Sequence, residues 1–255
     1  MLLTVDVGNT RATWIAHPEP SVSWDSRPRY VHGDKGLRQP EDPQALRAWL
    51  RSVGVAGSVL LHAVVAPRRA AELLEIAREV GVARCIGAGD PALRLDVANL
   101  CREPERVGKD RLLAASEARA RFGGAAVAVD AGTAITVDAV DESGAFRGGA
   151  IAPGPRLLAR ALRAETELLP EVDFRAVNAE RGRDTQSAIE LALFHGTGGL
   201  VDRLIAIVGQ GLAPRGVLLC GGYAPMLSPA LSTPHERERD VIHRALVRLY
   251  RAGGG

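Results

Sequence analysis

The sequence predicts an α/β protein built from two related halves, each with a mixed β-sheet. Runs typical of strands open each half, and helices then alternate with strands, a pattern that places helices on the faces of a sheet. A short motif, Asp-x-Gly-[Asn/Thr]-[Thr/Ala], follows an apolar run at Asp6 and again at Asp130. Self-similarity over this distance indicates a duplicated domain. We therefore expect an N-terminal domain at residues 1–117 and a C-terminal domain at residues 118–255.

The first half contains five runs that predict strands and two that predict helices. Asp42-Pro43 is typical of a helix start, because an Asp side chain accepts hydrogen bonds from the first N–H groups and Pro fits the first helical position. Gly54 and Gly81 end the two helical patterns. The predicted strands are residues 2–6, 11–16, 29–32, 58–65 and 83–86, and the predicted helices are residues 43–53 and 67–80.

The second half repeats this plan after a joining helix at residues 111–122, with Asp110 at its N-terminus. Asp184 is predicted to cap a long helix. Three glycines within this helix either allow close packing or mark a break. His195, beside them, is predicted to be packed and hydrogen-bonded. We expect this helix to bury Ile189, Leu193, Leu200 and Leu204, and its glycines are Gly196, Gly198 and Gly199. The other predictions are three strands within residues 125–151, helices at 155–169 and 235–251, a charged loop at 170–182, and a strand at 216–220.

Composition and charge favour a cytoplasmic protein without nucleic-acid or membrane partners. The net charge of +2 gives no electrostatic argument for binding either. The cysteines, Cys85, Cys101 and Cys220, are scattered, which suits a reducing compartment and offers no metal cluster. Asp6 interrupts the apolar start too early for a signal peptide, and we expect no apolar run of the roughly 20 residues that span a membrane.

The repeated motif has the chemistry of a phosphate holder. A glycine turn brings backbone N–H groups close to phosphate oxygens, and a carboxylate at a strand end can hold a cation or its water. In a single copy, a tight hairpin with Asp and Gly as turn formers is the favoured interpretation. The second copy favours two phosphate-holding hairpins that face each other across a cleft, as in actin-like kinases and ATPases.

Two further sites allow two interpretations each. Physical reasoning alone favours Asp110 as the N-cap of its helix, because Asp is a preferred capping residue. The functional interpretation is a carboxylate that accepts the proton of a substrate hydroxyl, with Arg111 pairing with an anionic substrate. Gly221-Gly222 after a strand permits close approach of a nucleotide, and a plain turn explains it equally well.

Taken together in this order, these motifs resemble the type III pantothenate kinase family. Asp6-Val7-Gly8-Asn9-Thr10 and Asp130-Ala131-Gly132-Thr133-Ala134 are similar to its two phosphate motifs. Gly108-Lys109-Asp110-Arg111 resembles its GxDR pantothenate motif, and residues 148–154 resemble its GGxIxPG segment. Asp184-Thr185 and residues 219–222 are similar to its later substrate and adenosine segments. The resemblance spans nearly the whole chain.

The resemblance implies a fold, an activity and an assembly. The fold is that of the acetate-and-sugar-kinase/Hsp70/actin superfamily: duplicated actin-like (ribonuclease H-like) domains, each a mixed five-stranded sheet flanked by helices, with an active-site cleft between the halves. The implied enzyme is a phosphotransferase with an alcohol group as acceptor, which uses ATP to convert pantothenate into 4'-phosphopantothenate in the first step of coenzyme A biosynthesis. A homodimer is the implied assembly.

The resemblance also assigns roles to individual residues. Asp110 is the implied catalytic proton acceptor, and Asp130 is the implied ligand of a monovalent cation, K⁺ or NH₄⁺, which is required beside ATP and Mg²⁺. Cys101 stands where family members commonly carry a substrate-contacting tyrosine. The implied ATP-binding residues are Asp6, Val7, Gly8, Asn9, Thr10, Arg11, Ala12, Thr13 and Thr133, and the implied substrate-binding residues are Gly108, Lys109, Asp110, Arg111, Thr185 and Cys101.

Other functions remain open at this point. The same fold can phosphorylate another small hydroxyl compound, because a fold does not fix a substrate. A kinase-derived regulatory factor without enzymatic activity is a second alternative, and the carboxylates of Asp6, Asp110 and Asp130 argue against it. A structural or nucleic-acid-binding module is the weakest alternative, given the balanced charge.

Overall fold

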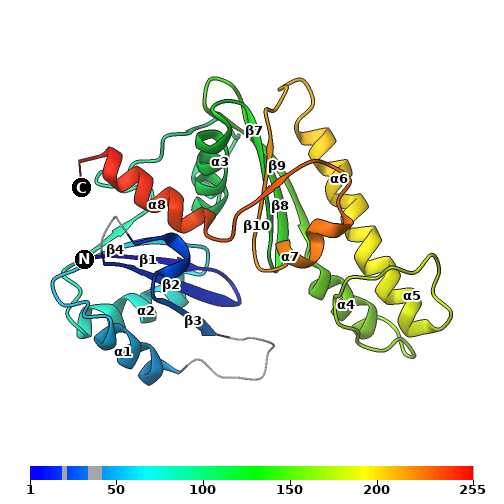
Figure 1. The fold of residues 1–255 in the computed structure, drawn as a ribbon, viewed down its shortest axis with the longest axis horizontal. Coiled ribbons are helices and arrows are strands. Elements are labelled where there is room, and N and C mark those ends of the chain that lie inside the picture. The colour runs from blue at the N-terminus through cyan, green and yellow to red at the C-terminus, as the bar shows by residue number, and fades with distance from the viewer. Residues whose placement is uncertain (19–21, 34–41, 255) are drawn as a thin grey trace. The chain divides into compact units, whose positions relative to one another are not determined.

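The chain forms two compact units, which are described separately (Figure 1). The computed structural model describes all residues except 19–21, 34–41 and 255. Unit 1 contains Met1–Asp96, Val107–Leu113 and Ile242–Gly255, and unit 2 contains Val97–Arg106 and Ala114–Val241. The predicted boundary between residues 117 and 118 lies inside a helix that both units share. The two predicted domains stay a prediction, because compactness alone does not show which part of a chain folds by itself.

Unit 1 is built on a five-stranded mixed sheet, as predicted. Its strand order is β3-β2-β1-β4-β5. β1 pairs antiparallel with β2, which pairs antiparallel with β3, whereas β1, β4 and β5 run parallel. The strands are β1 (Leu2–Val7), β2 (Arg11–His17), β3 (Arg29–Gly33), β4 (Val59–Val64) and β5 (Arg84–Gly87), so all five predicted strands are confirmed.

Helices α1 (Pro43–Ser52) and α2 (Pro67–Glu79) cover one face of this sheet (Figure 1). Successive side chains of a strand point to opposite faces, and the odd-numbered residues of β1 lie in the core beneath these helices. Helix α1 begins where predicted, because the Asp42 carboxylate accepts hydrogen bonds from the N–H groups of Gln44 at 2.9 Å and Ala45 at 3.1 Å. The core of this face includes Leu3, Val5, Val7, Leu46, Leu50 and Leu73.

The C-terminal helix α8 (Val241–Ala252) binds the opposite face through a buried hydrogen-bond chain. The Thr4 hydroxyl lies 2.9 Å from His17 Nε2 and 2.7 Å from His243 Nδ1. Arg27 donates to His17 Nδ1, so the proton of the neutral imidazole is on Nε2, which donates to Thr4, and Thr4 in turn donates to His243. Burial and the neighbouring charge of Arg27 lower the pKa of His17 to about 3, so this ring stays neutral.

Unit 2 repeats the topology of unit 1. Its strand order is β11-β10-β7-β8-β9-β6. The series β9-β8-β7-β10-β11 matches β3-β2-β1-β4-β5 in order and in the direction of each pair, which confirms the predicted duplicated fold. The short strand β6 adds a sixth strand beside β9, so the prediction of five strands is wrong for this unit. The strands are β6 (Ala98–Asn99), β7 (Ala126–Ala131), β8 (Ala134–Val140), β9 (Ala145–Pro153), β10 (Val217–Cys220) and β11 (Glu236–Arg237).

A long helix packs its apolar side onto the sheet of unit 2. It consists of α5 (Thr185–Leu191), a π-helical turn (Ala192–Gly196) and α6 (Thr197–Val208). Its glycines do not break it, and Gly198 packs so closely that an added Cβ would lie 2.3 Å from the Ala230 carbonyl oxygen. Ile189 and Leu193 are buried as predicted, but Leu200 is 37% exposed because it lies on the outer side. His195 is hydrogen-bonded to the Val177 carbonyl and is exposed rather than packed.

The expectation that no apolar run is long enough to span a membrane is wrong for this helix. Residues Thr185–Val208 form a 24-residue helix whose most apolar window has a mean hydropathy of 1.4, which is long and apolar enough to cross a membrane. In the structure, however, Ile189, Val201 and Ile205 belong to the apolar core of unit 2. In the structure 33% of that window is buried, so the helix covers the sheet with one apolar side, as amphipathic helices do.

Three helix boundaries differ from prediction. Helix α4 (Pro155–Ala164) ends before residue 169, and the Thr166 hydroxyl donates to the Leu162 carbonyl at its end. The terminal helix begins at Val241 because Glu236–Arg237 pairs with β10 instead. Helix α3 (Lys109–Phe122) begins before Asp110. The remaining helical segments are α7 (Ala224–Leu227) and the 3₁₀ turns Trp24–Ser26, Pro104–Arg106 and Ser228–Ala230.

Replacing Thr4 by Val tests the hydrogen-bond chain beneath α8. The change keeps the shape of the side chain but leaves His17 Nε2–H and His243 Nδ1 without this buried partner. We expect the free energy of unfolding in urea to fall by about 1–3 kcal/mol, the cost of unsatisfied buried polar groups. The control is Ser23→Ala, which removes an exposed hydroxyl pair with Ser26. Equal stability of the two variants would show that the hydrogen bonds of Thr4 do not hold α8 on the sheet.

Candidate active site

The first predicted phosphate turn joins β1 to β2. Asp6 pairs with Thr13 across the hairpin, so both side chains point to the same face of the sheet. The turn is closed by a hydrogen bond from the Gly8 N–H to the Arg11 carbonyl at 3.0 Å. The side chains of Val7 and Ala12 are completely buried, so they cannot contact a ligand. Only the backbone of these two residues could do so. Asn9, at the tip, is exposed.

The second predicted phosphate turn joins β7 to β8 with the same arrangement. Asp130 pairs with Thr136, as Asp6 pairs with Thr13. The Gly132 N–H donates to the Ala134 carbonyl at 3.0 Å, and Thr133 is exposed at the tip. Each unit therefore presents an Asp–Thr pair beside a glycine turn, at the end of its central strand.

Two glycines from other elements enclose the second turn. Gly221, at φ +93°, approaches so closely that an added Cβ would lie 2.2 Å from Asp130 Oδ1. An added Cβ at Gly154, after β9, would lie 2.4 Å from the Gly132 carbonyl oxygen. Both contacts require a residue without a side chain. At Gly221 the close approach is to the Asp130 carboxylate, and the predicted approach of a nucleotide to Gly221-Gly222 stays a prediction.

Asp110 lies in the first turn of α3 and is not its N-cap. The Gly108 carbonyl accepts the first helical hydrogen bond, from the Leu112 N–H at 3.4 Å, so the predicted cap is wrong by two positions. The Asp110 carboxylate folds back over Gly108, where an added Cβ would lie 2.3 Å from Oδ1. Burial raises the pKa of Asp110, although hydrogen bonding to the Arg111 backbone and the Arg111 charge act in the opposite direction. A carboxylate with a raised pKa is a better base than an ordinary aspartate.

The start of α3 lies near the carboxyl end of β5. The Lys109 side chain passes Gly89, where an added Cβ would lie 3.5 Å from Nζ. Gly89 follows β5, which runs parallel to β1 and β4, and ligands of α/β sheets bind at the carboxyl ends of parallel strands. Residues 8–11 and the start of α3 therefore both belong to this edge of the sheet in unit 1.

Cys101 and Thr185 belong to unit 2. The Cys101 Sγ lies 3.5 Å from the position of an added Cβ at Gly148, which places the thiol beside the predicted glycine segment of β9. Thr185 is exposed at the first position of α5. Unit 1 thus contains Asp6–Thr13 and Gly108–Arg111, and unit 2 contains Cys101, Asp130, Thr133 and Thr185.

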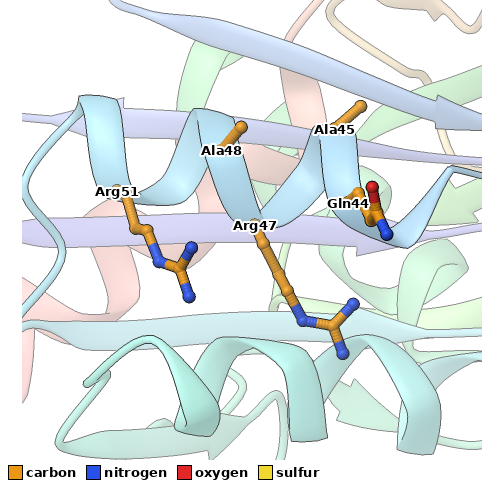
Figure 2. A pocket seen from close by; sticks show the side chains of 5 residues that line it. All are labelled: Gln44, Ala45, Arg47, Ala48 and Arg51. Atoms are coloured by element: carbon orange, nitrogen blue, oxygen red, sulfur yellow. The ribbon is translucent and has the colours of Figure 1, made fainter.

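One arginine near the first turn was missed by sequence reasoning. Arg69 Nη1 donates to the Gly8 carbonyl at 3.2 Å and so holds the turn from the first turn of α2. The available signal was a basic residue directly after a strand and a helix-starting Pro67. In contrast, the hollow along α1 is lined by none of the predicted site residues; its lining is Gln44, Ala45, Arg47, Ala48 and Arg51 (Figure 2).

Comparison with known sequences points to one family. A model of the type III pantothenate kinase family matches residues 2–207. A type III pantothenate kinase from Aromatoleum aromaticum is 34% identical over 251 residues, which cover 96% of each chain. One from Syntrophotalea carbinolica is 31% identical over 255 residues, covering 98% of each chain.

Comparison with solved structures supports the fold. A protein described as a Baf family transcriptional activator from Campylobacter jejuni matches with a TM-score of 0.60 at 16% identity, covering 99% of this chain and 98% of its own. A protein described as a 2-dehydro-3-deoxygalactonokinase from Sinorhizobium meliloti matches with a TM-score of 0.54 at 13% identity, covering 99% of both chains. At these identities the likeness concerns the fold alone.

Replacing Gly221 by Ala tests the close contact at Asp130. The methyl group would meet both Asp130 Oδ1 and the Ala131 backbone, and the left-handed φ adds strain. The matched control is Gly211→Ala, at φ +76° with nothing within 4 Å, which isolates a strain of about 1–2 kcal/mol. We expect Gly221→Ala to lose clearly more stability in urea unfolding than the control. Equal losses would mean that Asp130 and the Ala131 backbone both shift at no cost.

Proposed function

The chain belongs to the type III pantothenate kinase family, and we propose that its two Asp–Thr turns and Asp110 carry out the phosphorylation of pantothenate by ATP. The observation that carries the proposal is the family match over residues 2–207, which includes every predicted site residue. In the reaction, the primary hydroxyl of pantothenate loses its proton and its oxygen bonds to the γ-phosphorus. The bond from that phosphorus to the bridging oxygen breaks, and ADP leaves. The product is 4'-phosphopantothenate, the first intermediate of coenzyme A synthesis.

In this proposal Asp110 receives the proton of the substrate hydroxyl. Its burial supports the role, because the raised pKa increases its affinity for a proton. Phosphoryl transfer passes through a loose transition state and needs positioning more than covalent chemistry, so one well-placed carboxylate suffices. Arg111 is proposed to pair with the carboxylate of pantothenate, and Gly108, Lys109, Cys101 and Thr185 to complete the substrate site.

The two turns are proposed to bind the phosphates of ATP. The Gly8 and Gly132 N–H groups already donate within their own turns. Contacts with phosphate oxygens are therefore assigned to the other tip groups, including Asn9, Thr10 and Thr133, and to the Arg11 side chain. Gly8 and Gly132 act by closing tight turns, a role that differs from direct phosphate binding.

We propose that Asp130 holds a monovalent cation, K⁺ or NH₄⁺, and that Mg²⁺ accompanies ATP. The Asp130 carboxylate suits a hard cation, and Gly221 keeps side-chain bulk away from its Oδ1. No three His, Cys, Asp or Glu residues gather to hold a metal ion within the described part of the chain. Backbone carbonyls, water or phosphate oxygens would complete the ligand sets. Such a cation supplies positive charge near the phosphates.

We further propose a cytoplasmic homodimer. Exposed apolar residues on β9, α4 and the segment after it support a partner surface. Their exposed fractions are 64% for Ile151, 38% for Leu157, 36% for Leu162 and 88% for Leu168. Pantothenate and ATP are small molecules of metabolism, which fits a cytoplasmic place of action.

The proposed function is tested by measuring ADP release from ATP with the purified protein. Release that depends on pantothenate supports the proposal, and release with another small alcohol but not with pantothenate would redirect it to a different substrate. No release with any of them would favour the regulatory alternative. The same assay is run with and without potassium, because the cation proposal predicts a difference.

Replacing Asp110 by Asn separates the catalytic role from a structural one. Because the folded-state pKa is raised above the usual 3.8, the charged carboxylate costs stability at neutral pH, so Asp110→Asn should melt at the same or a higher temperature. As the base is lost, kcat should fall about 10²–10⁴-fold. The wild-type rate should also fall as the pH drops through the raised pKa. A stable variant that retains most of its turnover would remove Asp110 from the chemistry.

Replacing Asp130 by Asn tests the cation site. The amide keeps the size of the side chain but loses the negative charge that attracts a cation. We expect a higher KM for ATP and a weaker response of the rate to added potassium, with sodium chloride at equal ionic strength as the control. A variant with the wild-type potassium response would place the cation elsewhere.

A further inference from the structure

The segment between α4 and α5, residues 170–182, contains no helix or strand, so its position depends on side-chain contacts. Val172 and Phe174 anchor it in the core of unit 2. The Phe174 ring packs edge-on against Tyr223, with ring centroids 5.8 Å apart, and also contacts Phe194 at 6.2 Å. Tyr223 lies in the turn that begins with Gly221, beside Asp130. The apolar contacts thus connect the segment to the turn near the proposed cation ligand.

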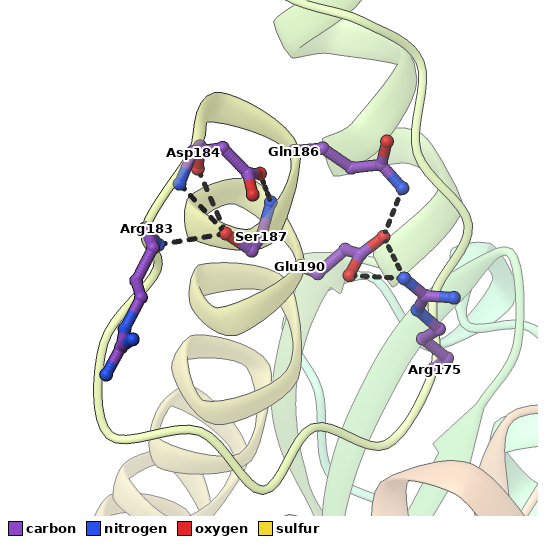
Figure 3. A network of polar contacts seen from close by, with 6 residues as sticks. All are labelled: Arg175, Arg183, Asp184, Gln186, Ser187 and Glu190. Carbon is purple, nitrogen blue, oxygen red and sulfur yellow. Dashed lines mark hydrogen bonds and ion pairs between the residues drawn. The ribbon is translucent and has the colours of Figure 1, made fainter.

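Directly after these anchors, an ion pair fixes the segment to α5 (Figure 3). Arg175 Nη2 donates to both carboxylate oxygens of Glu190, at 2.6 and 2.7 Å, and Gln186 Nε2 donates to Oε1 at 2.9 Å. The Glu190 side chain is only 8% exposed, whereas that of Arg175 is 61% exposed. The hydrogen bond from Arg175 is the main cause that holds the pKa of Glu190 below its ordinary value. A buried carboxylate is therefore kept charged by one partner from the segment and one from the first turn of α5.

A second set of contacts fixes the other side of the same helix turn. The Asp184 carboxylate accepts from the Ser187 N–H at 2.8 Å, and the Ser187 hydroxyl accepts from the Asp184 N–H at 3.1 Å and the Arg183 N–H at 3.0 Å. Figure 3 shows this capping box and the Glu190 cluster on different sides of α5. Thr185 lies between them in sequence, preceded by a residue of the box and followed by Gln186.

We propose that Arg175, Gln186 and Glu190 are positioning residues that set the place of Thr185 for the substrate. The inference rests on the proposed function, in which Thr185 contacts pantothenate. The capping box fixes the backbone of the first turn, and the Glu190 cluster fixes where the segment delivers the chain to that turn. A side chain that is already held in place loses little conformational freedom when it binds a substrate, so binding costs less. A small displacement of that side chain weakens binding. The cluster acts through Thr185 and touches no reacting atom.

Replacing Arg175 by Gln is the test, with Arg181→Gln as the matched control. Arg181 lies on the same segment, but its contact, Glu180 at 3.5 Å, is highly exposed and adjacent in sequence. We expect Arg175→Gln to raise the KM for pantothenate about 3- to 10-fold, with kcat and the KM for ATP within about twofold of wild type, because loss of positioning weakens binding without changing chemistry. Arg175→Lys keeps the positive charge, so its KM for pantothenate should lie between those of the wild type and Arg175→Gln. Arg181→Gln should behave as wild type.

Three results would overturn the inference. The first is a wild-type KM for pantothenate in Arg175→Gln. The second is a rise that Arg181→Gln shows equally, which would indicate a general effect of charge. The third is an equal rise of the KM for pantothenate and the KM for ATP together with a lower melting temperature, which would indicate a structural role alone. Failure of the proposed function is distinguishable, because the wild-type protein itself would then release no ADP with pantothenate, and both proposals would be rejected together.

Discussion

The alternation of side chains along the central strand of each unit is the constraint on which the site depends. In β1 the odd-numbered residues fill the core beneath α1 and α2, which forces Thr4 and Asp6 onto the other face. In β7, Val127, Val129 and Ala131 fill the core in the same way and place Asp130 opposite. A slip of one residue in register would move the carboxylates to the side of the core and the valines to the opposite face. The hydrophobic core therefore fixes the side of the sheet on which each carboxylate lies.

Most of the fold could be predicted because its signals are local. Apolar runs, Asp42-Pro43 and the repeated Asp-x-Gly motif each act within a few residues, and the structure has strands, a helix cap and paired turns at these places. The two-residue strands β6 and β11 carry no such signal, since a pair of residues pairs with a strand only where the rest of the fold brings them together. The start of α3 could not be fixed from residue type, because Asp is favoured both at the N-cap and within the first turn of a helix. The roles of individual residues came from the family resemblance, because Asp and Gly serve turns and caps as often as ligands.

Three carboxylates of the protein have pKa values shifted in opposite directions. Asp184 and Glu190 receive hydrogen bonds that lower the pKa of each, so they remain charged and serve structure. Asp110 receives partial compensation from Arg111, but burial dominates and raises its pKa. A protein gains little stability from such a group. A buried carboxylate with a raised pKa is the kind of group that the proposed role of Asp110 as proton acceptor requires.

The attachment of α8 to β1 has a consequence for how the chain is made. Thr4 and His243 are 239 positions apart, yet they share a buried hydrogen bond. During synthesis from the N-terminus, the first sheet emerges from the ribosome long before the helix that covers its second face. Until α8 has been made, Thr4 lacks its hydrogen bond with His243, and this face of the sheet is open to chaperones or to unwanted association. Unit 1 can therefore close only after α8 has left the ribosome, so a ribosome that stalls before residues 241–252 are made yields a nascent chain with unit 1 incomplete.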